Sequence, residues 1–566
     1  MTAETAGSGL VLKQQMSRDD VIMRAGLVVL GIALTLFVLF PIGALLKKAF
    51  ENKAGEVVGL ANFLLFFANP SLSASIGNSV FIAVVSTFFS VLLAFLFAYG
   101  LTRTCMPGRA VFRLIAQIPL LAPSLLSAIS LVYLFGNQGL AKSLLMGASI
   151  YGPIGIIIGE VFWTFPHAMI IIVTALAIAD ARLYEAANAL RANSWRVFWT
   201  VTLPGARYGL ISAILVVFVL VITDFGVPKV IGGQYNVLAT DIYKQVIGQQ
   251  NFQMGAVVGL LLLVPAVFAF IIDRIIQRRQ TALLSARAVP YAPKPSPGVD
   301  RLFFIICLAI SAAILIMLGV AFFASLATLW PYNLTPSFKN YDFDNMDGGG
   351  WLSYRNSLTM AALTAIIGTA VIFSGAYLLE KTRAFTMVRS AIQFLALLPL
   401  AVPGLVLGLG YIFFFNNPAN PLHGIYGTMA ILVLCTIAHF YSVSHLTAST
   451  ALKQIDPEFE TVAASLRVPF YTTFFRVTLP VSLPAVLDIG MYLFVNALTT
   501  VSAVVFLYAP STTLAAVAVL NMDDAGDTAP AAAMAMMIFF TAALVRILYN
   551  VLTQSFLARA QNWRRK

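Results

Sequence analysis

The sequence carries little charge for its length. Only 10% of its 566 residues are charged and 60% are hydrophobic, whereas an average soluble protein is about 25% charged. Water does not solvate so large an apolar surface, so the composition excludes an ordinary soluble enzyme or binding domain. It predicts a polytopic membrane protein.

Cysteine and histidine are scarce as well. The three cysteines, Cys105, Cys307 and Cys435, lie in or beside apolar runs without a Cys-x-x-Cys spacing, so we expect buried apolar roles rather than disulfides or metal ligands. The four histidines form no metal-spaced cluster and no nucleophile–base pairing, which argues against a membrane enzyme. Phosphate-cradling GxxxxGK[ST] loops are missing too, so we expect no cofactor or metal on this chain, and ATP chemistry would need a separate protein.

The apolar residues gather into twelve runs of about 20, the length that crosses a bilayer as a helix. The first 22 residues are polar and show no cleavable signal peptide, so the first run is expected to be an uncleaved anchor. Prolines inside runs, such as Pro123 and Pro403, need not break them, because neighbouring helices can satisfy the freed backbone groups. The expected spans are 23–46, 77–101, 114–136, 152–177, 207–228, 253–273, 302–327, 357–379, 390–415, 424–450, 481–508 and 529–553.

The basic residues are distributed unevenly between the two sides of these spans. With the N-terminus in the cytoplasm, 27 of the 35 Lys and Arg residues fall on the cytoplasmic side. Cytoplasmic loops of membrane proteins carry such an excess, which also accounts for the net charge of +12 without a nucleic-acid partner. Both termini are therefore expected in the cytoplasm.

The chain also reads as two copies of one unit. Asn78-Ser79 returns as Asn356-Ser357 after 278 residues, "PLLAP" at 119–123 returns as "PLAVP" at 399–403, and "VTLP" at 201–204 returns at 477–480. Six spans in each copy give parallel repeats about an axis along the membrane normal, which suits a transport pathway, although duplication can also build a mere scaffold. The expected parts are a tail (1–22), a first repeat (23–273), a linker (274–301), a second repeat (302–553) and a basic tail (554–566).

One cytoplasmic segment in each copy reads as a well-formed helix followed by an aromatic tail. Asp180 can cap the first helix, and Asp456 followed by Pro457 can cap the second. Small apolar side chains would let a partner approach closely, at Ala186, Ala187 and Leu190 in one copy and at Ala463, Ala464 and Leu466 in the other. The segments are either interfacial amphipathic helices or docking helices for two copies of a cytoplasmic partner, and their matched positions favour docking.

These segments resemble the "EAA" motif of permeases in ABC importers. The matching positions are Asp180, Leu183, Glu185, Ala186, Ala187, Leu190 and Leu203-Pro204, then Asp456, Phe459, Ala463, Leu466 and Leu479-Pro480. The resemblance implies an all-α permease with twelve transmembrane helices in two parallel six-helix repeats, in the bacterial inner (plasma) membrane. It also implies that the segments are coupling helices for two copies of an ATP-binding subunit, which uses ATP and Mg, and that an external binding protein delivers the substrate.

The chain departs from the family pattern in two ways. The family's glycine is Arg191 in one copy and Arg467 in the other. Either Asn193 takes the left-handed conformation in the first copy, or the arginines bear a cost on the order of 1–2 kcal/mol. The motif glutamate is Glu185 in the first copy but Thr461 in the second, where Glu460 stands one position early, so coupling is expected to be unequal.

The cargo is predicted less directly. The stretch "TDFGVPKVIGG", which begins at Thr223, resembles permeases for 2-aminoethylphosphonate, with iron(III), thiosulfate or polyamine importers as alternatives. An ion-coupled secondary transporter is a more distant alternative, because it would need a midplane carboxylate network. Polar residues within spans are the candidate pathway, although each can instead bond one helix to another: Asn78, Glu160, His167, Asp224, Asn356, His439, Tyr441, Asn496 and Thr499.

Overall fold

A computed structural model describes residues 17–178, 180–283, 289, 291–382, 385–456 and 458–560. Parts of the predicted tails and linker, residues 1–16, 284–288, 290 and 561–566, lie outside the described residues, as does Pro457. The first half contains α1 (Arg18–Leu34), α2 (Phe40–Ala49), α3 (Ala61–Ala68), α4 (Pro70–Arg103), α5 (Arg109–Gln117), α6 (Ser124–Phe135), α7 (Pro153–Ala177), α8 (Ala181–Ala189), α9 (Ser194–Val197), α10 (Leu203–Thr223), α11 (Gly226–Ile231), α12 (Leu238–Tyr243) and α13 (Phe252–Leu283).

The second half repeats this order and adds one short hairpin. Strands β1 (Ala327–Leu329) and β2 (Asn333–Pro336) pair antiparallel, with Leu329 opposite Asn333. The helices are α14 (Pro297–Leu326), α15 (Gly350–Lys381), α16 (Thr386–Leu397), α17 (Gly404–Phe415), α18 (Met429–Lys453), α19 (Glu458–Ser465), α20 (Phe470–Thr473), α21 (Leu479–Val481), α22 (Leu483–Thr499), α23 (Ala515–Ala525) and α24 (Thr528–Ala560).

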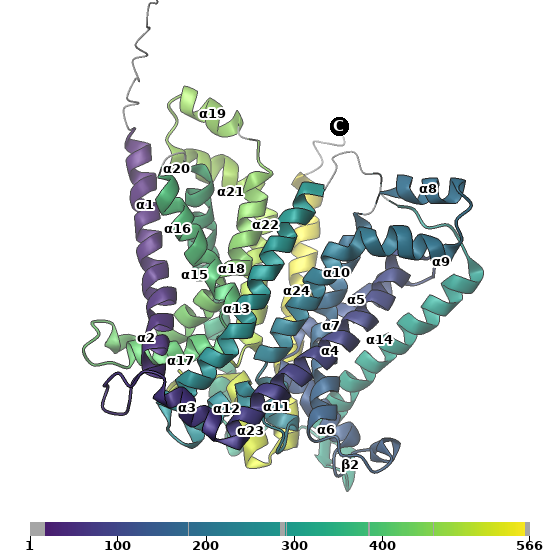
Figure 1. The fold of residues 1–566 in the computed structure, drawn as a ribbon, viewed down its shortest axis with the longest axis vertical. Helices are drawn as coiled ribbons and strands as arrows, with labels where there is room; N and C mark the ends of the chain where they lie inside the picture. The colour runs from purple at the N-terminus through teal and green to yellow at the C-terminus, as the bar shows by residue number, and fades with distance from the viewer. Residues whose placement is uncertain are drawn as a thin grey trace, which may run out of the picture.

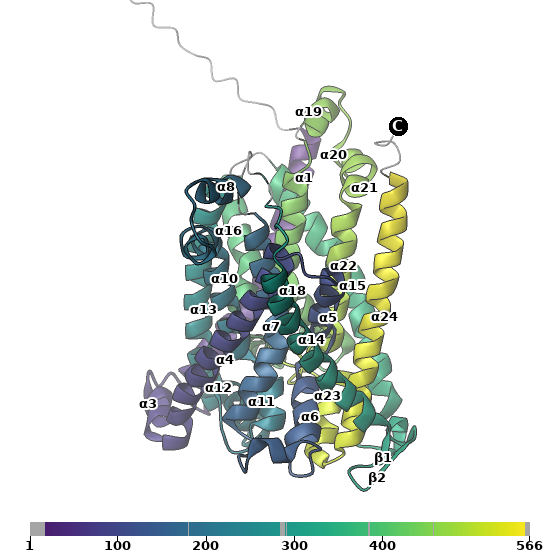
Figure 2. The ribbon, with the colours of Figure 1, turned by 90° about the vertical axis from the view of Figure 1, so that its right-hand side faces the viewer.

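The long helices form one bundle with two distinct ends (Figures 1 and 2). Helices α8 and α19 lie at one end, together with the start of α1 and the end of α24, and we call this the α8/α19 end. Helices α3, α11, α12 and α23 and the β hairpin lie at the other, the β1/β2 end. Among the described residues, nine helices are long and apolar enough to cross a membrane, or up to twelve if three bent helix pairs each count as one span.

Two of the predicted spans are bent where continuous helices were expected. The pair around Pro123 bends by 101°, and the pair around Pro403 bends by 115°. Ala122 and Val402 precede these prolines in extended conformation, with ψ of 141° and 116°. A proline disfavours the helical conformation in the residue before it and donates no hydrogen bond itself, so both breaks have a local cause.

A third bend, of 76°, lies between α21 and α22 in the second half, whereas the matching span of the first half is continuous. Pro484 is the local reason, because the corresponding position in the continuous first-half span is Tyr208. The predicted spans 207–228 and 481–508 also end early. Helices α10 and α22 stop at Thr223 and Thr499, because the next residues, Asp224 and Thr500, are extended.

The first span of each half packs against helices of the other half. Helices α1 and α2 pack on α15, α16 and α17, while α14 packs on α4, α5 and α6. The Tyr411 hydroxyl of α17 donates to the Phe37 carbonyl at 2.7 Å, which joins the halves inside the bundle. Within each half, α4, α7 and α10, or α15, α18 and α22, form the central group of helices. Cys307 and Cys435 are buried as expected, and Cys105 is half-buried.

Candidate functional site

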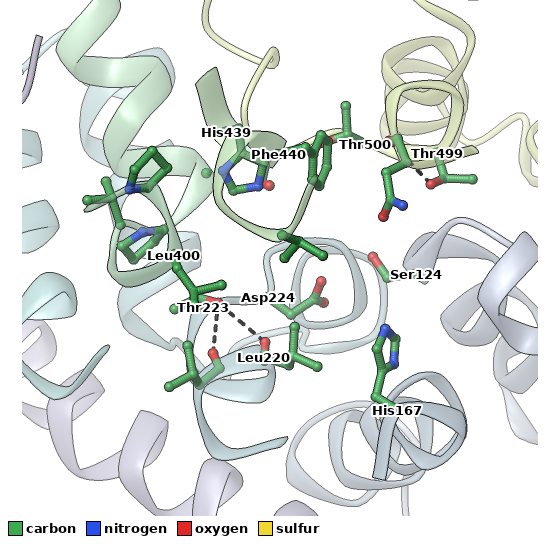
Figure 3. A pocket seen from close by; sticks show the side chains of 18 of the residues that line it. Ser124, His167, Leu220, Thr223, Asp224, Leu400, His439, Phe440, Thr499 and Thr500 are labelled. Carbon is green, nitrogen blue, oxygen red and sulfur yellow. Dashed lines mark hydrogen bonds between the residues drawn. The ribbon is translucent and has the colours of Figure 1, made fainter. Parts of the chain in front are cut away.

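A cavity of about 400 Å³ lies between the two halves, and we call it the seam cavity. Its walls come from matching elements, namely α6, α7 and α10 on one side and α17, α18 and α22 on the other (Figure 3). The helix breaks at Pro123 and Pro403 both border the cavity. These bends, which were not predicted from the sequence, therefore shape its walls. Polar and aromatic residues among those lining it are Ser124, Trp163, His167, Thr223, Asp224, His439, Phe440, Ser442, Tyr492, Asn496, Thr499, Thr500 and Ser502.

Asp224 is a carboxylate in the wall of the seam cavity. One of its oxygens accepts a hydrogen bond from the Val227 backbone N–H at 2.8 Å, at the start of α11. Ser124 lies beside the same carboxylate (Figure 3). Glu160 of α7 is fully buried next to Asp224, close enough for the two carboxyl groups to interact. Two carboxyl groups thus lie together at the seam.

The two candidate histidines belong to opposite halves. His167 lies on α7 and His439 on α18, and the Nδ1 of each is buried without a hydrogen-bond partner. Their rings contact aromatic neighbours, with centroid distances of 5.5 Å from His167 to Trp163 and 4.6 Å from His439 to Phe440. The sequence predicted both histidines but overlooked the aromatic residues, although Trp163 stands 276 residues before His439 and therefore shares its position in the repeat.

Asn496 and Thr499 also line the cavity, while Asn78, Asn356 and Tyr441 do not. The Asn78 side-chain amide donates to the Asn236 carbonyl at 2.9 Å. That of Asn356 donates at 3.0 Å to two carbonyls of the segment before α23. These bonds join helices to loops at the β1/β2 end. Tyr441 is buried and stacks on His445, with centroids 5.8 Å apart.

The first repeated segment forms helix α8 at the α8/α19 end. Asp180 caps it as predicted, accepting from the Arg182 N–H at 3.1 Å. Ala187 is buried against the bundle, so the expected flat face of Ala186, Ala187 and Leu190 is divided. Ala186 and Glu185 face outward, and Leu190 is 83% exposed. The exposed face of α8 therefore includes Leu183, Glu185, Ala186 and Leu190.

The second segment forms α19, which stands farther from the bundle (Figure 1). Asp456 accepts from the Glu458 N–H at 2.9 Å, which confirms it as a cap. None of the residues of α19 is fully buried, and apolar Phe459, Val462 and Leu466 are at least half exposed. Exposed apolar side chains gathered on one helix fit either of the two predicted roles, a docking surface or an amphipathic helix at the membrane interface. Thr461, Ala464 and Arg467 are exposed beside them, and Ala463 is half-buried.

Glu460 does not take the role of Glu185. Its carboxylate pairs with the ammonium of Lys381 at 2.8 Å, so it points back toward α15. Its counterpart in the repeat is the buried Tyr184, whereas Glu185 is exposed on α8. The two helices therefore present different charges outward, and unequal coupling of the halves stays a prediction.

The arginines that replace the family's glycine adopt the left-handed backbone conformation themselves. Arg191 has φ of 53° and Arg467 has φ of 55°. Ala192 N–H bonds to Ala187 O at 3.0 Å and Arg191 N–H to Asn188 O at 2.9 Å, which is a Schellman motif, and α19 ends in the same way. Asn193 instead has φ of −72° and caps α9, so the alternative that placed it in the left-handed region is wrong.

Comparison with known proteins gives the family. Residues 90–282 and 372–557 each match the family described as binding-protein-dependent transport system inner membrane component. The chain belongs to this family. It is a fused, two-repeat permease of an ABC importer, a multi-pass inner-membrane subunit of a transporter.

Relatives of the permease extend over nearly its whole length. It is 27% identical to FbpB 1 of Haemophilus influenzae over 517 residues, which is 88% of this chain and 80% of that protein. It is 26% identical to the ferric transport system permease protein FbpB of Actinobacillus pleuropneumoniae over 538 residues, or 91% and 76%. The sulfate transport system permease protein CysW of Synechocystis is 26% identical over 256 residues, covering 44% of this chain and 89% of CysW.

Proposed function

We propose that this permease imports iron(III), the alternative to 2-aminoethylphosphonate in the sequence prediction. The single observation that carries the proposal is the seam cavity, whose lining includes Asp224 and no Lys or Arg among the described residues. Carboxylate, hydroxyl and imidazole groups are ligands that iron accepts. The two FbpB relatives over most of the chain support the same cargo.

The seam cavity suits passage rather than storage of a cation. No group of three or more His, Cys, Asp or Glu residues is arranged to hold a metal ion in the part of the chain that the structure describes. A pathway needs binding weak enough for the ion to leave, so scattered ligands such as Asp224, His167 and His439 fit transient contact. Trp163, Phe440 and Tyr492 add ring faces that attract cations.

The cavity gives little support to 2-aminoethylphosphonate. A phosphonate is doubly anionic near neutral pH and is recognised in proteins mainly by arginine and lysine. Two features favour an anion, because the N-termini of α6 at Ser124 and of α17 at Gly404 border the cavity, and each carries a partial charge of about +0.5. Because the lining also holds the Asp224 carboxyl group and, among the described residues, no Lys or Arg, cation transport remains the better proposal.

ATP hydrolysis by two copies of a separate subunit would drive the transport. The exposed faces of α8 and α19 lie at one end of the bundle with the N-terminal end of α1 and the C-terminal end of α24 (Figure 2). We infer that this end is cytoplasmic, since most of the basic residues fall on this side. The β1/β2 end would then face the external binding protein.

Uptake of radiolabelled iron(III) tests the cargo. Cells that lack the chromosomal gene would carry the wild-type permease or the Asp224→Asn variant, with Glu56→Gln in an exposed loop as the matched carboxylate control. We expect iron uptake by the wild type and the control, and a loss of about tenfold or more for Asp224→Asn. If the wild type takes up no labelled iron(III) but accumulates labelled 2-aminoethylphosphonate, sulfate or spermidine, the assignment is overturned and that result names the cargo class instead.

A further inference from the structure

We propose that Arg103 and the linker residue Tyr291 position the first coupling helix, α8, and that an ion pair between Lys381 and Glu460 positions the second, α19. The proposal rests on the proposed function of α8 and α19 as docking helices for the ATP-binding subunit. It adds that the two helices are held by different forces. The linker between the repeats would act on α8 as well as join the halves.

Arg103 lies at the centre of the first contact. It is the last residue of α4, only 9% exposed, and its Nη2 donates to the Leu176 carbonyl at the end of α7 at 2.6 Å. Its guanidinium carbon lies 5.2 Å from the ring centre of Tyr184 on α8 and 4.7 Å from that of Tyr291. The centres of the two tyrosine rings are 4.3 Å apart and the ring planes are tilted by 41°, so the three side chains form one cluster.

Three further bonds fix Tyr184 and the linker at this place. The Tyr184 hydroxyl donates to Thr202 Oγ1 at 3.1 Å, which connects α8 to the segment that leads into α10. Ala181 N–H, at the start of α8, bonds to the carbonyl of Val289 in the linker at 2.9 Å. Asp300, at the end of the linker, accepts from Cys105 N–H at 2.8 Å. The linker is thus anchored on the first half at both of these points.

The second half uses the corresponding positions with other chemistry. Lys381 ends α15 as Arg103 ends α4, and Glu460 takes the place of Tyr184 in the repeat. Lys381 Nζ and Glu460 Oε1 are 2.8 Å apart, with 14% and 20% of the two side chains exposed. The start of α20, which follows α19 in the chain, is held from the other half, because Phe470 N–H donates to Asp19 of α1 at 2.8 Å.

These contacts respond differently to salt. A partly exposed ion pair is weakened by ionic strength, whereas the contact of the buried Arg103 guanidinium with two tyrosine rings depends mainly on packing and is screened much less. Raising the salt concentration should therefore loosen α19 more than α8. Removing the Tyr291 ring should loosen α8 and leave α19 unchanged.

Hydrogen exchange on the assembled transporter tests this. The permease would be reconstituted in nanodiscs with its ATPase and binding protein, as wild type, Tyr291→Ala, Tyr291→Phe and Lys381→Gln. For Tyr291→Ala we expect exchange at residues 181–192 to accelerate about threefold to tenfold, and more ATP to be hydrolysed per ion imported. Residues 458–468 should exchange as in the wild type, and Tyr291→Phe, which keeps the ring, should behave normally.

Lys381→Gln should give the reverse pattern. Exchange at 458–468 would rise and lose its dependence on salt, while 181–192 would stay protected. Unchanged exchange in Tyr291→Ala, or equal loosening of both helices by either variant, would overturn the proposal. The docking function is tested separately by Glu185→Lys on the exposed face of α8. If that variant transports normally, the docking function fails, whatever the exchange data show.

Discussion

The left-handed arginines at the ends of α8 and α19 give a prediction that can be worked through in numbers. A side chain in this conformation costs on the order of 1–2 kcal/mol, which glycine does not incur. A glycine in turn lowers the stability of the helix end by about 0.4–1 kcal/mol, because its backbone has more conformational freedom to lose when the helix end forms. Arg191→Gly should therefore strengthen the end of α8 by about 0.5–1 kcal/mol, and Arg467→Gly should do the same for α19.

The readout is exchange of the amides that close the Schellman motif. Ala192 N–H and Arg191 N–H bond to carbonyls of α8 and exchange only when the end of the helix opens. A gain of about 0.5–1 kcal/mol slows that exchange roughly twofold to fivefold. Arg191→Ala is the matched control, because it removes the guanidinium but keeps the Cβ atom, so it should show no slowing. Equal exchange in the Gly and Ala variants would refute the backbone explanation.

Three further predictions concern the β1/β2 end and the seam. The Lys229 ammonium on α11 and the Asp524 carboxylate on α23 are 2.8 Å apart and join the two halves. In a transport assay, Lys229→Glu should therefore impair uptake at least severalfold. Combining Lys229→Glu with Asp524→Lys should recover much of that uptake. Burial, aided by Asp524, raises the pKa of Asp523 from 3.8 to about 6; its contribution to stability is therefore greatest below pH 4 and falls as pH rises to 6, and thermal unfolding of Asp523→Asn should lose this dependence. Asp224→Asn should reduce transport while ATPase binding to the purified permease, measured by co-purification, stays unchanged, and a loss of assembly would contradict a pathway role.

Much of the architecture could be predicted from the sequence because it depends on local signals. Apolar runs of about 20 residues gave the spans, and repeated pairs such as Asn78 and Asn356 gave the two copies. Asp180 and Asp456 were recognisable as caps because a carboxylate before a helix accepts from its free N–H groups. The family resemblance of the segments around Glu185 and Ala463 agrees with the family match of both halves.

What the sequence left open depends on contacts between distant segments. The bends at Pro123 and Pro403 have local causes, but only tertiary packing decides whether a proline kinks a span or breaks it. The exchange of α1 and α14 between halves has no local signal, and neither has the stack of Arg103 on Tyr291. Ala187 was expected on the docking face, yet its direction depends on how α8 lies against the bundle.

The cargo is the hardest part to predict, because the sequence does not show which polar residues of the spans lie close to one another. Asp224, His167 and His439 come together at the seam, while Asn78 and Asn356 bond loops at the β1/β2 end. The proposed cargo therefore rests on the chemistry of the whole cavity rather than on the stretch beginning at Thr223, which resembles one substrate group.

Iron accumulation in proteoliposomes tests the central claim most directly. Vesicles would contain the permease with its ATPase and binding protein, with ATP on the side of α8 and α19 and no ion gradient imposed. We predict that radiolabelled iron(III) accumulates against its gradient only when the ATPase and ATP are present, and that Glu185→Lys abolishes the accumulation. Accumulation by the permease alone on a proton or sodium gradient, without ATP, would contradict the account.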